Sequence, residues 1–124
     1  NCFFEWQRKD KESKQPYCIR PKQEELFAFA AIWEHWKDKQ SEQVINSCAI
    51  VTTQANNAVS ELHDRMPAII FSSDYELWLD SKIGESKELE EMLSPCESDL
   101  LEIYAVSKSV NNPKNDDESV VKPV

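Results

Sequence analysis

The chain has very little glycine and no long hydrophobic run. Gly84 is the one glycine among 124 residues, whereas average usage of about 7% would give about eight or nine. Turns with a positive φ angle must therefore use Asn, Asp or a strained residue. The longest apolar run, residues 26–33, is too short to span a bilayer, which takes about 20 residues. The first residues do not resemble a secretory signal peptide, so we expect one soluble cytoplasmic domain without a membrane partner.

The four cysteines show neither a Cys-x-x-Cys pair nor zinc-type spacing to either histidine. The sequence also lacks a glycine-rich phosphate-binding loop. We therefore expect reduced thiols, no metal site and no other cofactor. Cys18 and Cys48 should pack inside strands. Cys2 could be read as a nucleophile, but nothing nearby in the sequence would activate its thiol, so we favour a structural role.

The formal net charge of −9 argues against a generic nucleic-acid binder. The charge is uneven, however. Residues 1–39 hold eight Lys or Arg against seven Asp or Glu, whereas residues 40–124 hold six against sixteen. An anionic partner should therefore contact the first third of the chain, with Arg65 as the exception.

Residue patterns predict both strands and short helices along the chain. The expected strands are residues 1–7, 16–19, 26–36, 44–53, 66–71 and 102–107. The expected helices are residues 54–62, one after a capping box at Ser73 and Glu76, and one from Ser86 to Pro95. Residues 26–33 should form the most buried strand, although their alanines also permit a helix. Residues 116–124 should form an acidic, flexible tail.

The run from His63 to Pro67 places an imidazole, a carboxylate and a guanidinium side by side. Pro67 disfavours the α region for Met66, so a helix ending near His63 should give way to extended chain. Polar groups at such a junction can point into a cleft. The alternative is a surface turn with an ion pair between Asp64 and Arg65.

Glu5 lies between Phe4 and Trp6 in the first expected strand. A carboxyl group among aromatic rings is partly desolvated, which favours its protonated form and suits general acid–base work. The alternative is an exposed carboxylate on the solvent side of a half-buried strand.

Six stretches together resemble the SOS response-associated peptidase (SRAP) family. They follow the family order and cover nearly the whole chain. They are Phe3-Phe4-Glu5-Trp6, Gln15-Pro16-Tyr17-Cys18-Ile19-Arg20-Pro21, Phe27 to Glu34, Thr52-Thr53-Gln54-Ala55-Asn56, His63-Asp64-Arg65-Met66-Pro67, and Val106-Ser107 with Val110-Asn111-Asn112.

The resemblance implies an α+β fold around a curved, barrel-like antiparallel sheet with short flanking helices. It also implies an enzyme that processes abasic sites in single-stranded DNA during the SOS response to DNA damage. In the family, an N-terminal cysteine exposed by removal of the initiator Met condenses with the sugar aldehyde and closes a thiazolidine. This crosslinks protein to DNA. The word peptidase in the family name suits the removal of the protein's own initiator Met.

The resemblance also implies roles for five residues. Glu5 and His63 match the catalytic acid–base pair, and Trp6 and Arg65 match DNA-binding residues. Thr52 matches a residue that lines the same pocket. The chemistry agrees, because iminium formation needs one group that gives a proton and another that takes one.

Family members carry an earlier segment that begins with the nucleophilic cysteine, and we expect that segment to be missing here. Residues 1–124 would then be the C-terminal part of a single SRAP-like domain, incomplete at its N-terminus and monomeric. Cys2 does not match the family nucleophile, so we expect no crosslink. Two alternatives stay open: a non-catalytic remnant that binds single-stranded DNA weakly through Trp6 and Arg65, or an acidic interaction domain.

Overall fold

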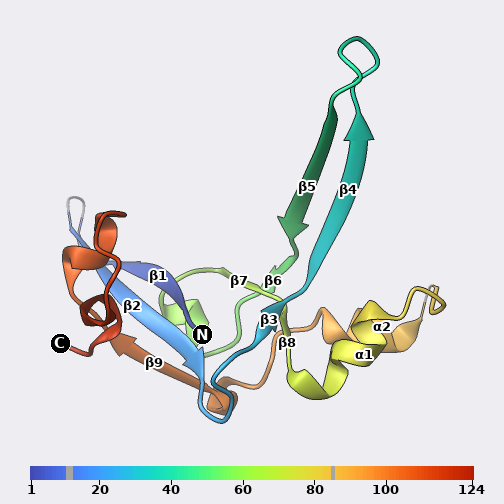
Figure 1. Cartoon of the computed structure of the whole chain (residues 1–124). Helices are drawn as coiled ribbons and strands as arrows, with labels where there is room; N and C mark the ends of the chain where they lie inside the picture. Colours follow the sequence, from blue (N-terminus) through green and yellow to red (C-terminus); the bar gives the residue numbers. More distant parts are fainter. Residues whose placement is uncertain (11–12, 85) are drawn as a thin grey trace.

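The computed structural model describes residues 1–10, 13–84 and 86–124. Its largest sheet is antiparallel and has the strand order β1-β2-β9 (Figure 1). These strands are β1 (Phe3–Arg8), β2 (Lys14–Pro21) and β9 (Leu101–Ala105). Strand β1 therefore lies at one edge of the sheet, with its residues in register with β2 from Phe3 opposite Ile19 to Arg8 opposite Lys14.

Three further antiparallel pairs and several short helices complete the described fold. The pairs are β3 (Ala28–Phe29) with β8 (Ile69–Ile70), β4 (Ala31–Lys37) with β5 (Val44–Ile50), and β6 (Thr52–Gln54) with β7 (Arg65–Pro67). The α-helices are α1 (Tyr75–Leu79) and α2 (Lys87–Met92). The 3₁₀ turns are η1 (Val59–Glu61), η2 (Ser72–Asp74), η3 (Ser98–Leu100), η4 (Lys108–Asn111) and η5 (Glu118–Val121).

This architecture confirms a mixed fold of antiparallel sheets with short helices, but it corrects the expected barrel. Among the described residues the strands form four separate sheets, and none closes on itself. Within the same ranges, no helix is long and apolar enough to cross a membrane.

The main core lies between the β1-β2-β9 sheet and the segment that contains η1 and β7. Its buried residues are Ile19, Val59, Met66, Ile69 and Leu101, with Phe3, Phe27 and Phe29 packed against them. Full burial of such side chains contributes about 1.5–3 kcal/mol each. Because Met66 and Val59 belong to this core, the intervening residue His63 is held at its edge.

The β4–β5 hairpin projects from the rest of the molecule (Figure 1). The expected burial of residues 26–33 is therefore wrong beyond Ala30, and it is also wrong at Leu26, which is 72% exposed. Ala30 is fully buried, but Trp33 is 75% exposed. Cys48 on β5 is exposed as well, whereas Cys18 is buried as predicted. The composition correctly predicted strands in this region. However, β4 and β5 pair only with each other, so both faces of their two-stranded sheet stay exposed to solvent. In the described residues, the one positive φ angle is 59° at Glu42, in the hairpin turn.

The helix expected over residues 54–62 is also wrong, because Gln54 still belongs to β6 and Asn56 starts a different turn. The Asn56 side chain accepts a hydrogen bond from the Val59 amide at 3.0 Å and donates one to the Cys96 carbonyl at 2.9 Å. Such side-chain bonds compete with helix formation. The result is the single 3₁₀ turn η1 before β7.

The two expected helix caps have different outcomes. Ser86 caps α2 as predicted, because its hydroxyl accepts a hydrogen bond from the Leu89 amide at 3.1 Å. The capping box at Ser73 and Glu76 does not form, since the chain enters α1 through the 3₁₀ turn η2 without a side-chain cap.

The C-terminal residues fold back on the main sheet. Tyr104 donates a hydrogen bond to the Val121 carbonyl at 3.0 Å, and the Val124 amide donates to the Ala105 carbonyl at 3.1 Å. The flexibility expected of residues 116–124 stays a prediction, but these contacts give the segment a defined place beside β9.

Candidate active site

Glu5 and His63 lie close together, although 57 residues of sequence separate them. Alternation along β1 places Glu5 on the same face as Phe3, which packs into the main core. Partial burial raises the pKa of the Glu5 carboxyl, and the neighbouring His63 charge partly lowers it. The carboxyl therefore keeps its proton to a higher pH than an exposed Glu does.

The turn before β7 holds the His63 ring from one side. The His63 amide donates to the Val59 carbonyl at 3.0 Å, and its Nδ1 lies 3.1 Å from the Arg65 amide. The same Nδ1 lies 3.2 Å from the Arg65 carbonyl oxygen and 3.2 Å from Asp64 Oδ1. Nδ1 thus has a donor partner when it is deprotonated and acceptor partners when it carries a proton. His63 can change protonation state without losing its anchor.

The Asp64–Arg65 ion pair of the alternative interpretation does not appear among the described residues. Instead, Arg65 Nη2 donates to the carbonyl oxygen of Thr52 at 2.6 Å and to its Oγ1 at 2.9 Å. Thr52 and Arg65 come from the paired strands β6 and β7. The pairing of β6 with β7 thus fixes Nη2 of the Arg65 guanidinium. The other N–H groups of this guanidinium make no hydrogen bond to any described residue.

Gln7 is a site residue that sequence analysis missed. It follows Glu5 by two positions on β1, so the strand period puts both on one face. Gln7 Nε2 donates to the Glu61 carbonyl at 3.3 Å, and Gln7 Oε1 accepts from the Tyr17 hydroxyl at 3.2 Å. Gln7 thereby joins β1 to the turn that leads to His63. The alternation could have flagged its face, but no sequence pattern indicates its partner 54 residues away.

Trp6 lies on the opposite face of β1 from Glu5, as strand alternation requires. Its indole Nε1 donates to Asn111 Oδ1 at 2.8 Å, and its ring lies 6.5 Å from that of Phe4. The structure therefore brings Glu5, His63, Arg65 and Thr52 to one region, and it places Trp6 across the sheet from them.

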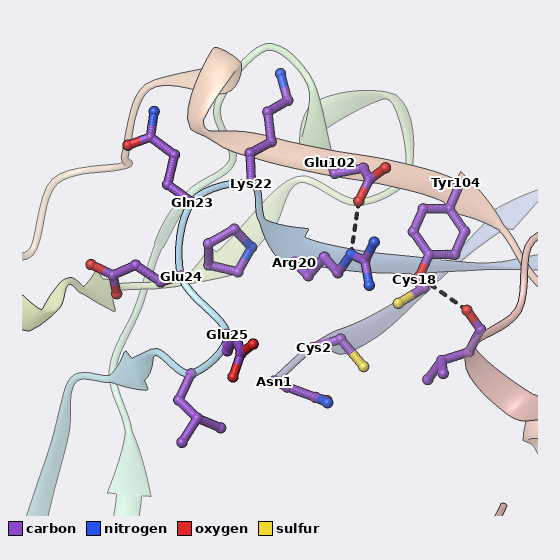
Figure 2. A pocket seen from close by; sticks show the side chains of 13 residues that line it. Asn1, Cys2, Cys18, Arg20, Lys22, Gln23, Glu24, Glu25, Glu102 and Tyr104 are labelled. Carbon is purple, nitrogen blue, oxygen red and sulfur yellow. Dashed lines mark hydrogen bonds and ion pairs between the residues drawn. The ribbon is translucent and has the colours of Figure 1, made fainter. Parts of the chain in front are cut away.

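Cys2 also faces away from Glu5. Figure 2 shows it beside Cys18 and Tyr104, in a cavity of about 500 Å³ bordered by the Arg20–Glu102 ion pair. Burial and a hydrogen bond with Cys18 raise the pKa of the Cys2 thiol to about 11. A thiol with such a pKa is a poor nucleophile at neutral pH. In the described ranges, no three His, Cys, Asp or Glu side chains cluster closely enough to hold a metal ion.

Residues 1–113 match the family described as SOS response associated peptidase (SRAP). The abasic site processing protein YoqW of Bacillus subtilis strain 168 is 36% identical over 120 residues, which cover 97% of this chain and 53% of that protein. The abasic site processing protein HMCES of Gallus gallus is 29% identical over 141 residues, covering 98% of this chain and 41% of the relative. The chain thus spans about half the length of the curated relatives it matches.

Two crystal structures share the fold. A protein from Bacteroides thetaiotaomicron superposes with a TM-score of 0.87 at 27% identity, over 99% of this chain and 53% of that one. A protein from Bordetella bronchiseptica gives a TM-score of 0.71 at 18% identity, over 86% of this chain and 51% of that one. The second likeness supports the fold alone.

Proposed function

We propose, because the chain belongs to the SOS response associated peptidase (SRAP) family, that it acts in processing abasic sites in single-stranded DNA. The relatives carry the name abasic site processing protein. Residues 1–124 would supply Glu5 and His63 as the acid–base pair, with Arg65 and Trp6 contacting DNA and Thr52 lining the pocket.

The single observation that carries this proposal is that Gln7, on the Glu5 face of β1, bonds to the turn that leads to His63, which puts the Glu5 carboxyl within the influence of the His63 charge. Condensation of an amine with the sugar aldehyde releases water, so the leaving oxygen needs a proton and the amine must lose one. A carboxyl with a raised pKa can give that proton. The His63 imidazole, which has a hydrogen-bond partner in both protonation states, can take the proton that the amine loses.

Arg65 would fix the DNA backbone beside this pair. One arm of its guanidinium bonds to Thr52, and the remaining N–H groups can donate to a phosphate. A phosphate contact positions the strand without reading its sequence. That suits a reader of damaged sites, which occur in any sequence.

The crosslinking step of the proposal uses an N-terminal cysteine other than Cys2. Cys2 lies across the sheet from Glu5, and its thiol has a pKa of about 11. Self-processing, a monomeric state, an intracellular location and a barrel-like sheet in the longer relatives belong to the same proposal. A longer relative could pair further strands with edge strand β1.

An external nucleophile tests the acid–base pair directly. Free cysteine forms a thiazolidine with an abasic aldehyde: its amine displaces water to give the C=N bond, and its thiol then adds to the carbon. We expect the chain to accelerate this reaction on abasic single-stranded DNA, followed by mass spectrometry of the oligonucleotide. Glu5→Gln and His63→Asn should abolish the acceleration.

The hairpin supplies matched controls. Glu34 and His35 are exposed neighbours on β4, in the hairpin that projects from the rest of the molecule (Figure 1). Glu34→Gln and His35→Asn should leave the acceleration unchanged. Equal rates with and without the wild-type chain would refute the proposal, and so would equal losses in the site and control variants.

The position of Cys2 favours one second candidate, which is non-covalent binding of single-stranded DNA by these residues. The rate of cysteine addition and the salt dependence of oligonucleotide binding, measured on the same chain, separate the two candidates, and a denaturing gel of the chain with abasic DNA checks for a covalent product. Salt-sensitive binding without any acceleration of cysteine addition would support the second candidate. A covalent band lost on Cys2→Ala would contradict both.

A further inference from the structure

A second polar site lies on the face of β1 that carries Trp6. It is a groove of about 440 Å³ lined by Trp6, Arg8, Lys14, Lys108 and Asn111. We call these residues the basic groove. Its three cations come from the end of β1, the start of β2 and the 3₁₀ turn η4, so the fold gathers them from distant parts of an otherwise acidic chain.

Fold stability does not account for this gathering of charge. Arg8 and Lys14 are direct partners in the β1–β2 register, and like charges in opposite positions destabilise a sheet. None of the groove cations forms an ion pair with a described residue. Asp10 also lines the groove, but its carboxylate oxygens accept hydrogen bonds from Ser13.

The remaining walls of the basic groove are held in place. Trp6 Nε1 donates to Asn111 Oδ1 at 2.8 Å, which fixes the indole against η4. The Ser107 hydroxyl accepts from the Ser109 amide at 3.2 Å and caps the start of η4, where Lys108 lies. A preformed basic site loses less free energy to ordering when an anion binds.

We infer that the basic groove binds backbone phosphates of the single-stranded DNA that extends beyond the abasic site. The inference rests on the proposed function, which places the abasic sugar at Glu5 and His63. Among the described residues strand β1 is an edge of its sheet, so a flexible DNA strand can cross that edge from the Glu5 face to the Trp6 face. The occupant is polyanionic, since three cations that form no ion pair with a described residue favour repeated phosphates over a single carboxylate.

The test compares two labelled oligonucleotides, each with a central abasic analogue. One has about four nucleotides and the other about sixteen, the range that one single-strand-binding fold covers. The variant is Lys14→Gln with Lys108→Gln. The matched control is Lys82→Gln with Lys87→Gln, two exposed lysines near α2. Fluorescence anisotropy over a salt series gives affinity and its salt slope.

We expect the groove variant to bind the long oligonucleotide on the order of tenfold more weakly at moderate salt. Its salt slope should fall by about 1.4, because each single-strand phosphate contact contributes about 0.7. The short oligonucleotide and the control variant should be unaffected. Equal losses in both double variants, equal affinity of the wild type for both lengths, or no binding at low salt would overturn the inference.

An intact oligonucleotide of the same length separates this inference from the proposed function. Retained length dependence without a preference for the abasic analogue would contradict the proposed function and support the basic groove. An abasic preference without length dependence would overturn the basic groove alone.

Discussion

Replacing Gln7 by alanine removes two hydrogen bonds that tie β1 to its surroundings, to the Tyr17 hydroxyl at 3.2 Å and to the Glu61 carbonyl at 3.3 Å. A neutral hydrogen bond contributes about 0.5–1.5 kcal/mol net. Because both bonds are long and water can reach them, we expect the free energy of unfolding to fall by only about 1 kcal/mol. Urea denaturation measures this loss.

The effect on chemistry should be larger than the effect on stability. Gln7 connects the strand that carries Glu5 to the turn that leads to His63. A displacement of about 1 Å between reacting groups can cost about 100-fold in rate. We therefore expect Gln7→Ala to reduce the acceleration of cysteine addition by at least about tenfold.

Gln15 offers a matched control, since it is the register partner of Gln7 on β2. Its amide donates to the Val106 carbonyl at 2.8 Å and to the Pro16 carbonyl at 3.0 Å, and neither bond reaches η1. Gln15→Ala should cost similar stability and leave the acceleration intact. An unchanged rate in Gln7→Ala, or an equal rate loss in both variants, would refute the positioning role.

Four further predictions follow from the same contacts. His63→Asn should raise the pKa of the Glu5 carboxyl further, because the His63 charge lowers it; a carboxyl NMR titration measures this. Since burial raises that pKa, unfolding free energy should decrease as pH rises from the unfolded pKa through the folded one, and Glu5→Gln should remove this decrease. Arg65→Lys should weaken oligonucleotide binding by a factor on the order of ten in anisotropy, because Lys has no planar fork. Met66→Ala should lower the free energy of unfolding by about 2–5 kcal/mol in urea denaturation. Replacing the exposed Trp33 by alanine should lower it by less than about 0.5 kcal/mol.

Local signals predicted the elements that depend on local chemistry. Pro67 restricts Met66, and the chain does change there from the turn η1 to strand β7. The Ser86 cap formed because its partner is three residues away. The closeness of Glu5 and His63 followed from the family resemblance and not from spacing, since no periodicity relates positions so far apart.

Features that depend on distant partners could not be predicted. Asn56 ended the expected helix partly by bonding to Cys96, which lies 40 residues later. The apolar composition of residues 26–33 correctly indicated strands, but burial requires a neighbouring layer, and β4 has only β5 beside it. Gln7 was missed for the same reason, because its carbonyl partner belongs to a turn that sequence analysis assigned to a longer helix.

The placement of Trp6 has a consequence for how DNA must lie. Adjacent residues on a strand point to opposite faces, so Glu5 and Trp6 cannot contact the same side of a bound nucleotide. If Glu5 meets the abasic sugar, Trp6 can reach only bases that lie on the other face of β1. Its neighbours on that far face are Arg8 and Lys14, whose charges suit phosphates. The two faces of β1 would then hold consecutive parts of one DNA molecule. Trp6→Ala should therefore weaken the binding of long oligonucleotides without slowing cysteine addition on short ones.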